Sequence, residues 1–192
     1  MIKIVPTTHL YSKETIEGII KDFNPDVIGV ELCETRFKAL TGQVPVGKGD
    51  NSLIDNITTS IKEKAEQEGL DYGADMKTAM FYALNNNIPL LLVDKDIMKI
   101  KEELLTIPIE EQLFLQQELI KFQTENINQP VDEELVLKNL KENVPTMYKI
   151  LIEGRNEYIA NKIKEVINKY PEKNIIIFLG KGHSREIERL IR

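Results

Sequence analysis

The stretch NIIIFLGKGHS, residues 174–184, indicates the fold class of this 192-residue chain. It is a continuous apolar run rich in isoleucine, which ends at Gly180 and is followed by His183. A run of this kind, bounded by Asn and Gly, is typical of a strand buried on both faces, as in parallel sheets. The histidine is then expected just past the carboxyl end of a buried strand.

Three further stretches have the same character: IKIV (2–5), DVIGVEL (26–32) and IPLLLV (88–93). The segment SKETIEGIIKDF (12–23) separates the first two and reads as a helix with Ser12 as its N-cap. A helical crossover of this length favours parallel pairing. We therefore predict an α/β fold with a mostly parallel central sheet, flanked by helices, with strands near 2–5, 26–32, 88–93 and 174–180.

Periodic apolar residues predict further helices. Short helices are expected at 34–40 and 184–192, and a longer one at 73–86 has the apolar stripe Met76, Ala79, Met80, Ala83 and Leu84. A helical block at 97–170, broken at Pro108, Pro130 and Pro145, predicts three or four helices that act as a lid or pair with a second copy in a homodimer. We expect residues 1–192 to form a single domain.

Composition narrows the function classes. The chain is 42% hydrophobic with a net charge of −6, which argues against nucleic acid or an anionic membrane as the partner. Cys33 is the only cysteine, so no internal disulfide forms and a cytoplasmic location is expected. No run reaches about 18 apolar residues, so we expect no membrane segment. Gly42, Gly47 and Lys48 match part of a phosphate-loop motif, but Gly49 stands where that motif needs Ser or Thr.

Polar groups follow all four predicted strands. His9 follows the first strand, Glu31 ends the second, Asp94 the third, and His183 follows the last. Open α/β sheets form their binding crevices at these carboxyl ends, so the four groups are expected to converge. The alternative is that each residue only caps a helix or accepts from backbone amides.

Two imidazoles and a carboxylate form a ligand set for a divalent metal, and manganese, cobalt, zinc and iron are not distinguished by it. His9, Glu31 and His183 are the expected ligands. Such a metal lowers the pKa of its bound water and polarises a carbonyl, which is the chemistry of a hydrolase. Glu34 and Asp94 are candidates for the general base.

Three neighbouring residues are candidates for supporting roles. Gly180 and Gly182 would let the chain turn sharply close to a ligand, although glycines also serve ordinary strand-to-helix turns. Arg36 would orient Glu31 or bind a substrate carboxylate through two hydrogen bonds, and its alternative is a surface ion pair.

Several blocks of the chain, in the same order, resemble the TraB or pheromone-shutdown family, whose relatives include the Tiki proteins. These blocks are PTTHLYSKETIEGII, NPDVIGVELCETRFKAL, YGADMKTAMFYALNNNIPLLLVDKDI, IEGRNEYIANKI and FLGKGH. The resemblance implies a metal-dependent hydrolase built around two G-x-x-H motifs and a glutamate, which correspond to His9, His183 and Glu31. It also implies catalytic or substrate-binding roles for Arg36 and Arg155, and supporting roles for Asp75 and Asp96.

This chain departs from the family pattern in three respects. Pro6 replaces the first glycine of the first motif, and Lys95 replaces an arginine whose planar fork a lysine cannot supply. A C-terminal membrane segment found in some members is absent from this sequence. The leading hypothesis is a divalent-metal-dependent hydrolase, a peptidase using a metal-activated water. The alternatives are a non-catalytic peptide- or metal-binding module and a small-molecule esterase.

Overall fold

The central sheet has four parallel strands in the order β1-β4-β2-β3. We describe a computed structural model, in which residues 1–8, 11–45, 59, 62–63, 66, 71, 73–124 and 133–192 are placed. The strands are β1 (Ile2–Thr7), β2 (Val27–Val30), β3 (Leu90–Leu92) and β4 (Ile175–Gly180). The predicted parallel α/β fold is therefore confirmed, with each strand inside or within two residues of its expected range.

The last strand lies in the middle of the sheet. β1 and β2 each pair with β4, so that Ile4 lies beside Ile177 on one side and Gly29 lies beside Ile177 on the other. All six residues of β4 are buried. This position explains the uninterrupted apolar run of residues 175–179, because a central parallel strand has no face in contact with water.

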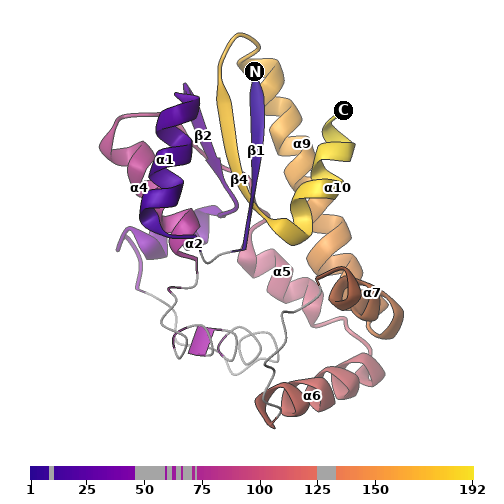
Figure 1. Ribbon diagram of the computed structural model, residues 1–192. Helices are drawn as coiled ribbons and strands as arrows, with labels where there is room; N and C mark the ends of the chain where they lie inside the picture. Colours follow the sequence, from indigo (N-terminus) through magenta and orange to yellow (C-terminus); the bar gives the residue numbers. More distant parts are fainter. Residues whose placement is uncertain are drawn as a thin grey trace.

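Helices cover both faces of the sheet (Figure 1). α1 (Lys13–Phe23) and α4 (Ala74–Asn85) pack on one face against Ile176 and Phe178 of β4. α9 (Gly154–Lys169) and α10 (Lys181–Ile191) pack on the other face against Ile175, Ile177 and Leu179. The alternation of β4 side chains between the two clusters follows from the two-residue period of a strand.

The predicted start of α1 is confirmed, whereas one residue assigned to the apolar stripe of α4 is not buried. The Ser12 hydroxyl accepts from the Thr15 amide at 3.3 Å, which confirms the predicted N-cap. Leu84, predicted to belong to the apolar stripe of α4, is instead 41% exposed. At about 100° per residue, Leu84 is rotated to the margin of the stripe formed by Met76, Ala79, Met80 and Ala83.

The helical block lies beyond the carboxyl ends of the strands (Figure 1). It comprises α5 (Ile97–Leu104), α6 (Ile109–Thr124), α7 (Glu133–Asn143), α8 (Pro145–Tyr148) and the π-helical turn η1 (Lys149–Glu153), which continues into α9. The prediction of three or four helices was too low, because Pro145 begins a separate short helix and a π turn follows it. Pro130 lies outside the described residues.

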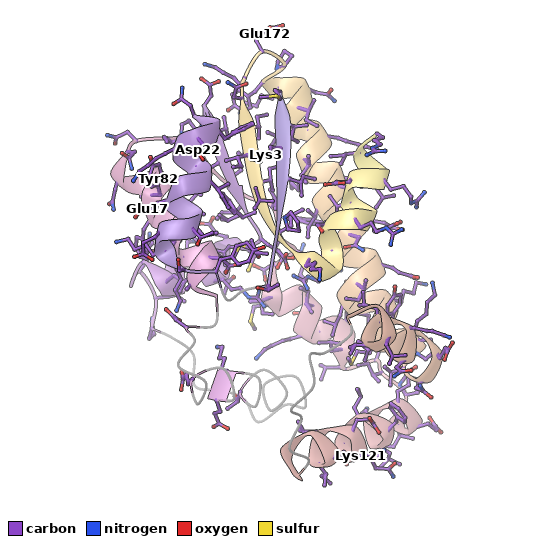
Figure 2. All side chains as sticks on the ribbon, in the orientation of Figure 1. Lys3, Glu17, Asp22, Tyr82, Lys121 and Glu172 are labelled. Atoms are coloured by element: carbon purple, nitrogen blue, oxygen red, sulfur yellow. The ribbon has the colours of Figure 1, made fainter. Side chains whose placement is uncertain are left out.

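The helical block has an apolar cluster of its own, which includes Ile100, Leu104, Leu115, Val144 and Met147. Figure 2 shows Lys121 of α6 at the opposite end of the molecule from Glu172, which precedes β4. The block therefore extends the molecule beyond the carboxyl edge of the sheet.

The remaining predicted helices are α2 and the helix at the end of the chain. α2 spans Glu34–Leu40, as predicted, but the motif residues Gly47, Lys48 and Gly49 lie outside the described residues. The last helix begins at Lys181, three residues earlier than predicted, so Gly182 and His183 belong to its first turn. In the part of the chain that the structure describes, no helix is both long and apolar enough to cross a membrane.

The absence of a side chain at Gly29 is required by the central strand. A Cβ atom there would lie 3.0 Å from Cγ1 and 3.2 Å from Cγ2 of Ile177. We predict that Gly29→Ala lowers the free energy of unfolding by about 1–3 kcal/mol, the usual cost of overpacking a core. Gly18→Ala is the control, because a Cβ in that helix meets nothing within 4 Å. Urea unfolding checks both, and an unchanged midpoint for Gly29→Ala contradicts the prediction.

Candidate active site

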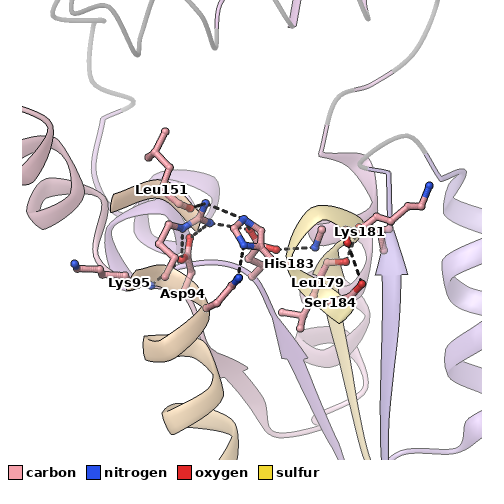
Figure 3. Close-up of polar contacts among 12 residues, drawn as sticks. Asp94, Lys95, Leu151, Leu179, Lys181, His183 and Ser184 are labelled. Atoms are coloured by element: carbon pink, nitrogen blue, oxygen red, sulfur yellow. Dashed lines mark hydrogen bonds and ion pairs between the residues drawn. The ribbon is translucent and has the colours of Figure 1, made fainter. Parts of the chain in front are cut away.

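Polar side chains from four elements converge at the carboxyl edge of the sheet (Figure 3). Glu31 directly follows β2, and Asp94 follows β3 after one intervening residue. Arg155 lies in the first turn of α9, and His183 lies in the first turn of α10. Three of the four groups predicted at strand ends, Glu31, Asp94 and His183, are thus brought together. His9, the fourth, lies outside the described residues.

Arg155 joins the two carboxylates. Its Nε donates to Asp94 Oδ1 at 3.0 Å and its Nη2 donates to Asp94 Oδ2 at 2.9 Å, which is a bidentate pair. The same Nη2 donates to Glu31 Oε1 at 2.7 Å. Burial by itself lowers the pKa of Arg155, but the charges of Asp94 and Glu31 and their hydrogen bonds outweigh it and raise the pKa. The guanidinium therefore stays charged at every pH at which the protein is folded.

His183 is held in one orientation by Asn156. Nδ1 of His183 lies 2.7 Å from Asn156 Oδ1, and a carbonyl oxygen can only accept, so the hydrogen is on Nδ1. Nε2 then carries the lone pair and accepts from Arg155 Nη1 at 3.2 Å. The histidine thus presents an unprotonated nitrogen, the form required of a metal ligand or a general base.

Asn156 is a site residue that the sequence reasoning missed. It is the first member of the buried stripe Asn156, Ile159, Ala160 and Ile163 on α9. A polar residue on an otherwise apolar stripe is a signal that could have identified it, because a buried amide needs hydrogen-bond partners.

Gly180 orients Glu31 through its backbone. Its N–H donates to Glu31 Oε2 at 2.6 Å, while Oε1 faces Arg155 and Nε2 of His183. Neither Gly180 nor Gly182 has a positive φ, and the chain passes directly from β4 at Gly180 into α10 at Lys181. A Cβ at Gly182 would meet nothing within 4 Å, which leaves the backbone accessible there.

A π-helical turn precedes Arg155. The Gly154 N–H bonds to the Lys149 carbonyl, and the Leu151 carbonyl within the turn accepts from Arg155 Nη1 at 3.4 Å. A Cβ at Gly154 would lie 3.2 Å from the Lys149 oxygen, so the glycine relieves a close contact. π turns inside helices occur frequently at functional sites.

The carboxylate of Glu111, on α6, caps the start of α8, the short helix that precedes η1. It accepts from the backbone N–H groups of Thr146 and Met147, both at 3.1 Å. α6 is thereby attached to the segment that carries Arg155.

Two predicted catalytic residues on α2 have peripheral positions. Arg36 Nη1 lies 3.5 Å from Asp94 Oδ2, and its side chain is 41% exposed, so it stands at the open side of the cluster. Glu34 is exposed and pairs with Lys38 at 3.2 Å. The structure does not bring Glu34 to the cluster.

The residues that follow β3 support the fold beside the site. Asp96 is the N-cap of α5, where it accepts from the Met98 amide and from the Thr35 hydroxyl, both at 2.8 Å. Lys95 is bound at 2.6 Å to each carboxylate oxygen of Glu103, so its ammonium group faces α5. The Lys95 backbone N–H donates to Asp94 Oδ1 at 2.8 Å, whereas the Lys95 side chain takes no part in the Asp94–Arg155 pair.

Two other residues singled out from the sequence lie in α4 and β1. Asp75 is fully buried in the first turn of α4, where its Oδ1 accepts from the Met76 amide at 2.8 Å. Pro6 lies in β1, an edge strand, where a missing N–H is tolerated.

Glu31 Oε1 and His183 Nε2 meet only part of the requirement of a divalent metal for ligands. Glu31 Oε1 and His183 Nε2 are 3.8 Å apart, and two ligands of one ion lie roughly 3–4 Å apart at the usual bond lengths. Both atoms now face the Arg155 guanidinium, which would compete with an ion for their lone pairs. Among the residues that the structure places, no group of three His, Cys, Asp or Glu is arranged to hold a metal. The pair fits two ligands, and a third must come from elsewhere.

Comparison with known proteins places this arrangement in context. The model of the TraB/PrgY/gumN family matches residues 5–192. The uncharacterized protein MJ1365 of Methanocaldococcus jannaschii is 29% identical over 220 residues, an alignment that covers 100% of this chain and 53% of that protein. The chain therefore spans about half the length of this relative.

The buried carboxylates depend on Arg155 for compensation. Side-chain exposure is 12% for Arg155, 6% for Glu31 and 0% for Asp94. We predict that Arg155→Met lowers the free energy of unfolding by about 3–5 kcal/mol at neutral pH, because it leaves buried charge unpaired. The control is Arg189→Met, which breaks an exposed pair with Glu186 and should change the urea midpoint little. Equal effects of the two variants would contradict a special role for Arg155.

The cap of α5 makes stability depend on pH. The hydrogen bond from Thr35 lowers the pKa of Asp96, so its contribution is present above the ordinary Asp pKa of about 3.9 and is lost as the pH falls through the lower folded value. We predict that Asp96→Ala costs about 1 kcal/mol at neutral pH and that the difference narrows below about pH 4. Urea unfolding of both proteins, at neutral pH and below about pH 4, measures this difference. Thr35→Val is the control, because it removes the hydroxyl that donates to Asp96 but keeps the Asp96 cap.

Proposed function

This chain belongs to the TraB/PrgY/gumN family, and on that basis and the geometry of its site we propose that it is a divalent-metal-dependent hydrolase acting on peptides. The observation that supports the proposal most directly is the convergence of Glu31 Oε1 and His183 Nε2, 3.8 Å apart. Asn156 holds the imidazole so that its lone pair faces the carboxylate. Metal-ligating histidines commonly have such a partner on the other ring nitrogen.

Glu31 and His183 would hold the ion, and His9 is the third ligand expected from the sequence. When bound, such an ion lowers the pKa of a water molecule and polarises the carbonyl that is attacked. The remaining chemistry falls to the chain itself. Gly180 fixes one oxygen of Glu31 by its N–H, which leaves the other oxygen directed at the reacting groups.

Arg155 would stabilise negative charge on the substrate. Its guanidinium is buried beside His183, and a fixed cation in a water-poor site is effective where an oxyanion develops. Asp94 holds that guanidinium by two hydrogen bonds, so it acts as a positioning residue. Arg36, half-exposed at the open side, is suited to bind a substrate carboxylate.

A second candidate function is supported by two contacts of Arg155, with Glu31 Oε1 at 2.7 Å and with His183 Nε2 at 3.2 Å. These are the two atoms that would otherwise bind the metal. In this alternative no ion takes part, and the site is that of a small-molecule esterase. His183 Nε2 then accepts the proton of the attacking water, and Arg155 binds the carbonyl oxygen. A non-catalytic binding module is the third alternative, and turnover separates it from both.

We predict that the purified protein cleaves unstructured peptides, that chelation abolishes cleavage, and that adding back a divalent metal restores it. His183→Ala and Glu31→Gln should each lower kcat by about 100-fold or more, since each removes a group that acts in the chemical step. Metal content of the purified protein, measured beside that of His183→Ala, should fall in the variant.

Glu165→Gln is the matched control for Glu31→Gln, because Glu165 lies on the surface of α9 in a pair with Lys162. Activity that survives chelation but is lost in His183→Ala would support the metal-free esterase instead. Full activity in both site variants would eliminate both catalytic proposals.

A further inference from the structure

Every hydrogen-bond donor of Arg155 is engaged within the site. A guanidinium carries five N–H groups. Two of them form the bidentate pair with Asp94, through Nε and Nη2, and the other N–H of Nη2 donates to Glu31 Oε1 at 2.7 Å. The two N–H groups of Nη1 donate to His183 Nε2 at 3.2 Å and to the Leu151 carbonyl at 3.4 Å. The bonds that the structure describes therefore use all five donors and leave none for a substrate oxygen.

The bonds to His183 and Glu31 are the ones that a divalent ion would replace. A neutral imidazole has one lone pair, which is on Nε2 here because Nδ1 carries the hydrogen. That lone pair accepts from Arg155 or binds an ion, but it cannot do both. At Glu31 Oε1, 3.8 Å away, an ion would meet the charge of the guanidinium, and like charges repel more strongly in a buried site than in water. Ion and guanidinium therefore exclude each other at both atoms.

Asp94 keeps the guanidinium in the site when the other bonds open. Its side chain is 0% exposed, and it accepts from Nε at 3.0 Å and from Nη2 at 2.9 Å. An ion at Glu31 and His183 leaves both of these bonds intact. The N–H groups that the ion frees belong to a side chain that is only 12% exposed, so they need a new acceptor in place of water.

We propose that the Arg155 guanidinium occupies the place of the divalent ion at Glu31 and His183, and that binding of the ion releases two of its N–H groups to hold the substrate carbonyl oxygen. The inference rests on the proposed metal-dependent hydrolysis for the identity of the ion and of the substrate. In the ion-free protein, Arg155 compensates the buried carboxylates and has no donor for substrate. Ion and substrate then each raise the affinity for the other, because coupling between two sites is reciprocal.

The competition is tested by calorimetric titration of zinc and of manganese in the absence of substrate. Arg155→Met should bind the ion at least about tenfold more tightly than wild type, within the range of about 5–150-fold that is usual for coupled sites. The ion should also raise the urea midpoint of Arg155→Met by more than it raises that of wild type, because it replaces the lost cation. A purely structural role of Arg155 predicts the opposite, weaker binding in the variant.

Arg36→Met is the charge-matched control. Arg36 reaches Asp94 Oδ2 at 3.5 Å rather than either of the two atoms that the ion would bind, and its side chain is 41% exposed. Its removal should change the affinity for the ion by less than about threefold, because an exposed charge is screened by salt. His183→Ala should lose the ion, which assigns the binding to this site.

A second measurement uses the wild-type protein, so that it decides the question even where Arg155→Met does not fold. Arginine side chains are labelled with ¹⁵N, and exchange of the Arg155 N–H protons with solvent is measured with and without zinc. With zinc, the Nε proton should stay protected because Asp94 still holds it. Exchange of the Nη protons should become at least about tenfold faster, because their bonds to Glu31 and His183 are lost.

Four results would overturn the proposal. They are equal or weaker binding of the ion in Arg155→Met, the same gain in Arg36→Met, Nη protons that stay protected in the zinc-bound wild type, and no binding of zinc or manganese by any of these proteins. No measurement requires turnover. Metal-dependent cleavage of peptides therefore stands if the competition fails, and the competition stands if the protein cleaves no peptide.

Discussion

The guanidinium of Arg155 compensates two buried carboxylates, and the arrangement of the site depends on this. Glu31 and Asp94 end neighbouring strands, so the parallel sheet itself brings their charges together. Burying them without a cation would cost several kcal/mol each. The rest of the site follows from where Arg155 must lie, because its third nitrogen reaches His183 and its helix carries Asn156.

The helical block is connected to the sheet through the same residue. Glu111 on α6 caps the start of α8, α8 leads into the π turn, and the turn ends at Gly154 just before Arg155. An uninterrupted series of contacts therefore runs from the far helices to the candidate active site.

The sequence predicted the sheet well because its strands are encoded locally, by apolar runs with defined ends. The proximity of Glu31, Asp94 and His183 could be predicted from the sequence for the same reason, because the carboxyl ends of parallel strands share one edge of the sheet. Arg155 came only from the family resemblance, because it lies 124 residues from Glu31 and no local pattern links the two. Asn156 and the π turn depend on tertiary packing, and the exposure of Leu84 depends on the exact rotation of α4.

The position of β4 has a consequence for how the protein is made. β1 and β2 have no bonds to each other along the sheet, and both are completed by a strand near the C-terminus. During synthesis, β1 and β2 leave the ribosome before β4, the strand with which both pair, exists. Their apolar edges must then stay exposed or be shielded by chaperones until residues 175–180 emerge. A nascent chain that stops short of this strand would lack the link between β1 and β2 and would also lack His183, so no partly made product could have a complete site.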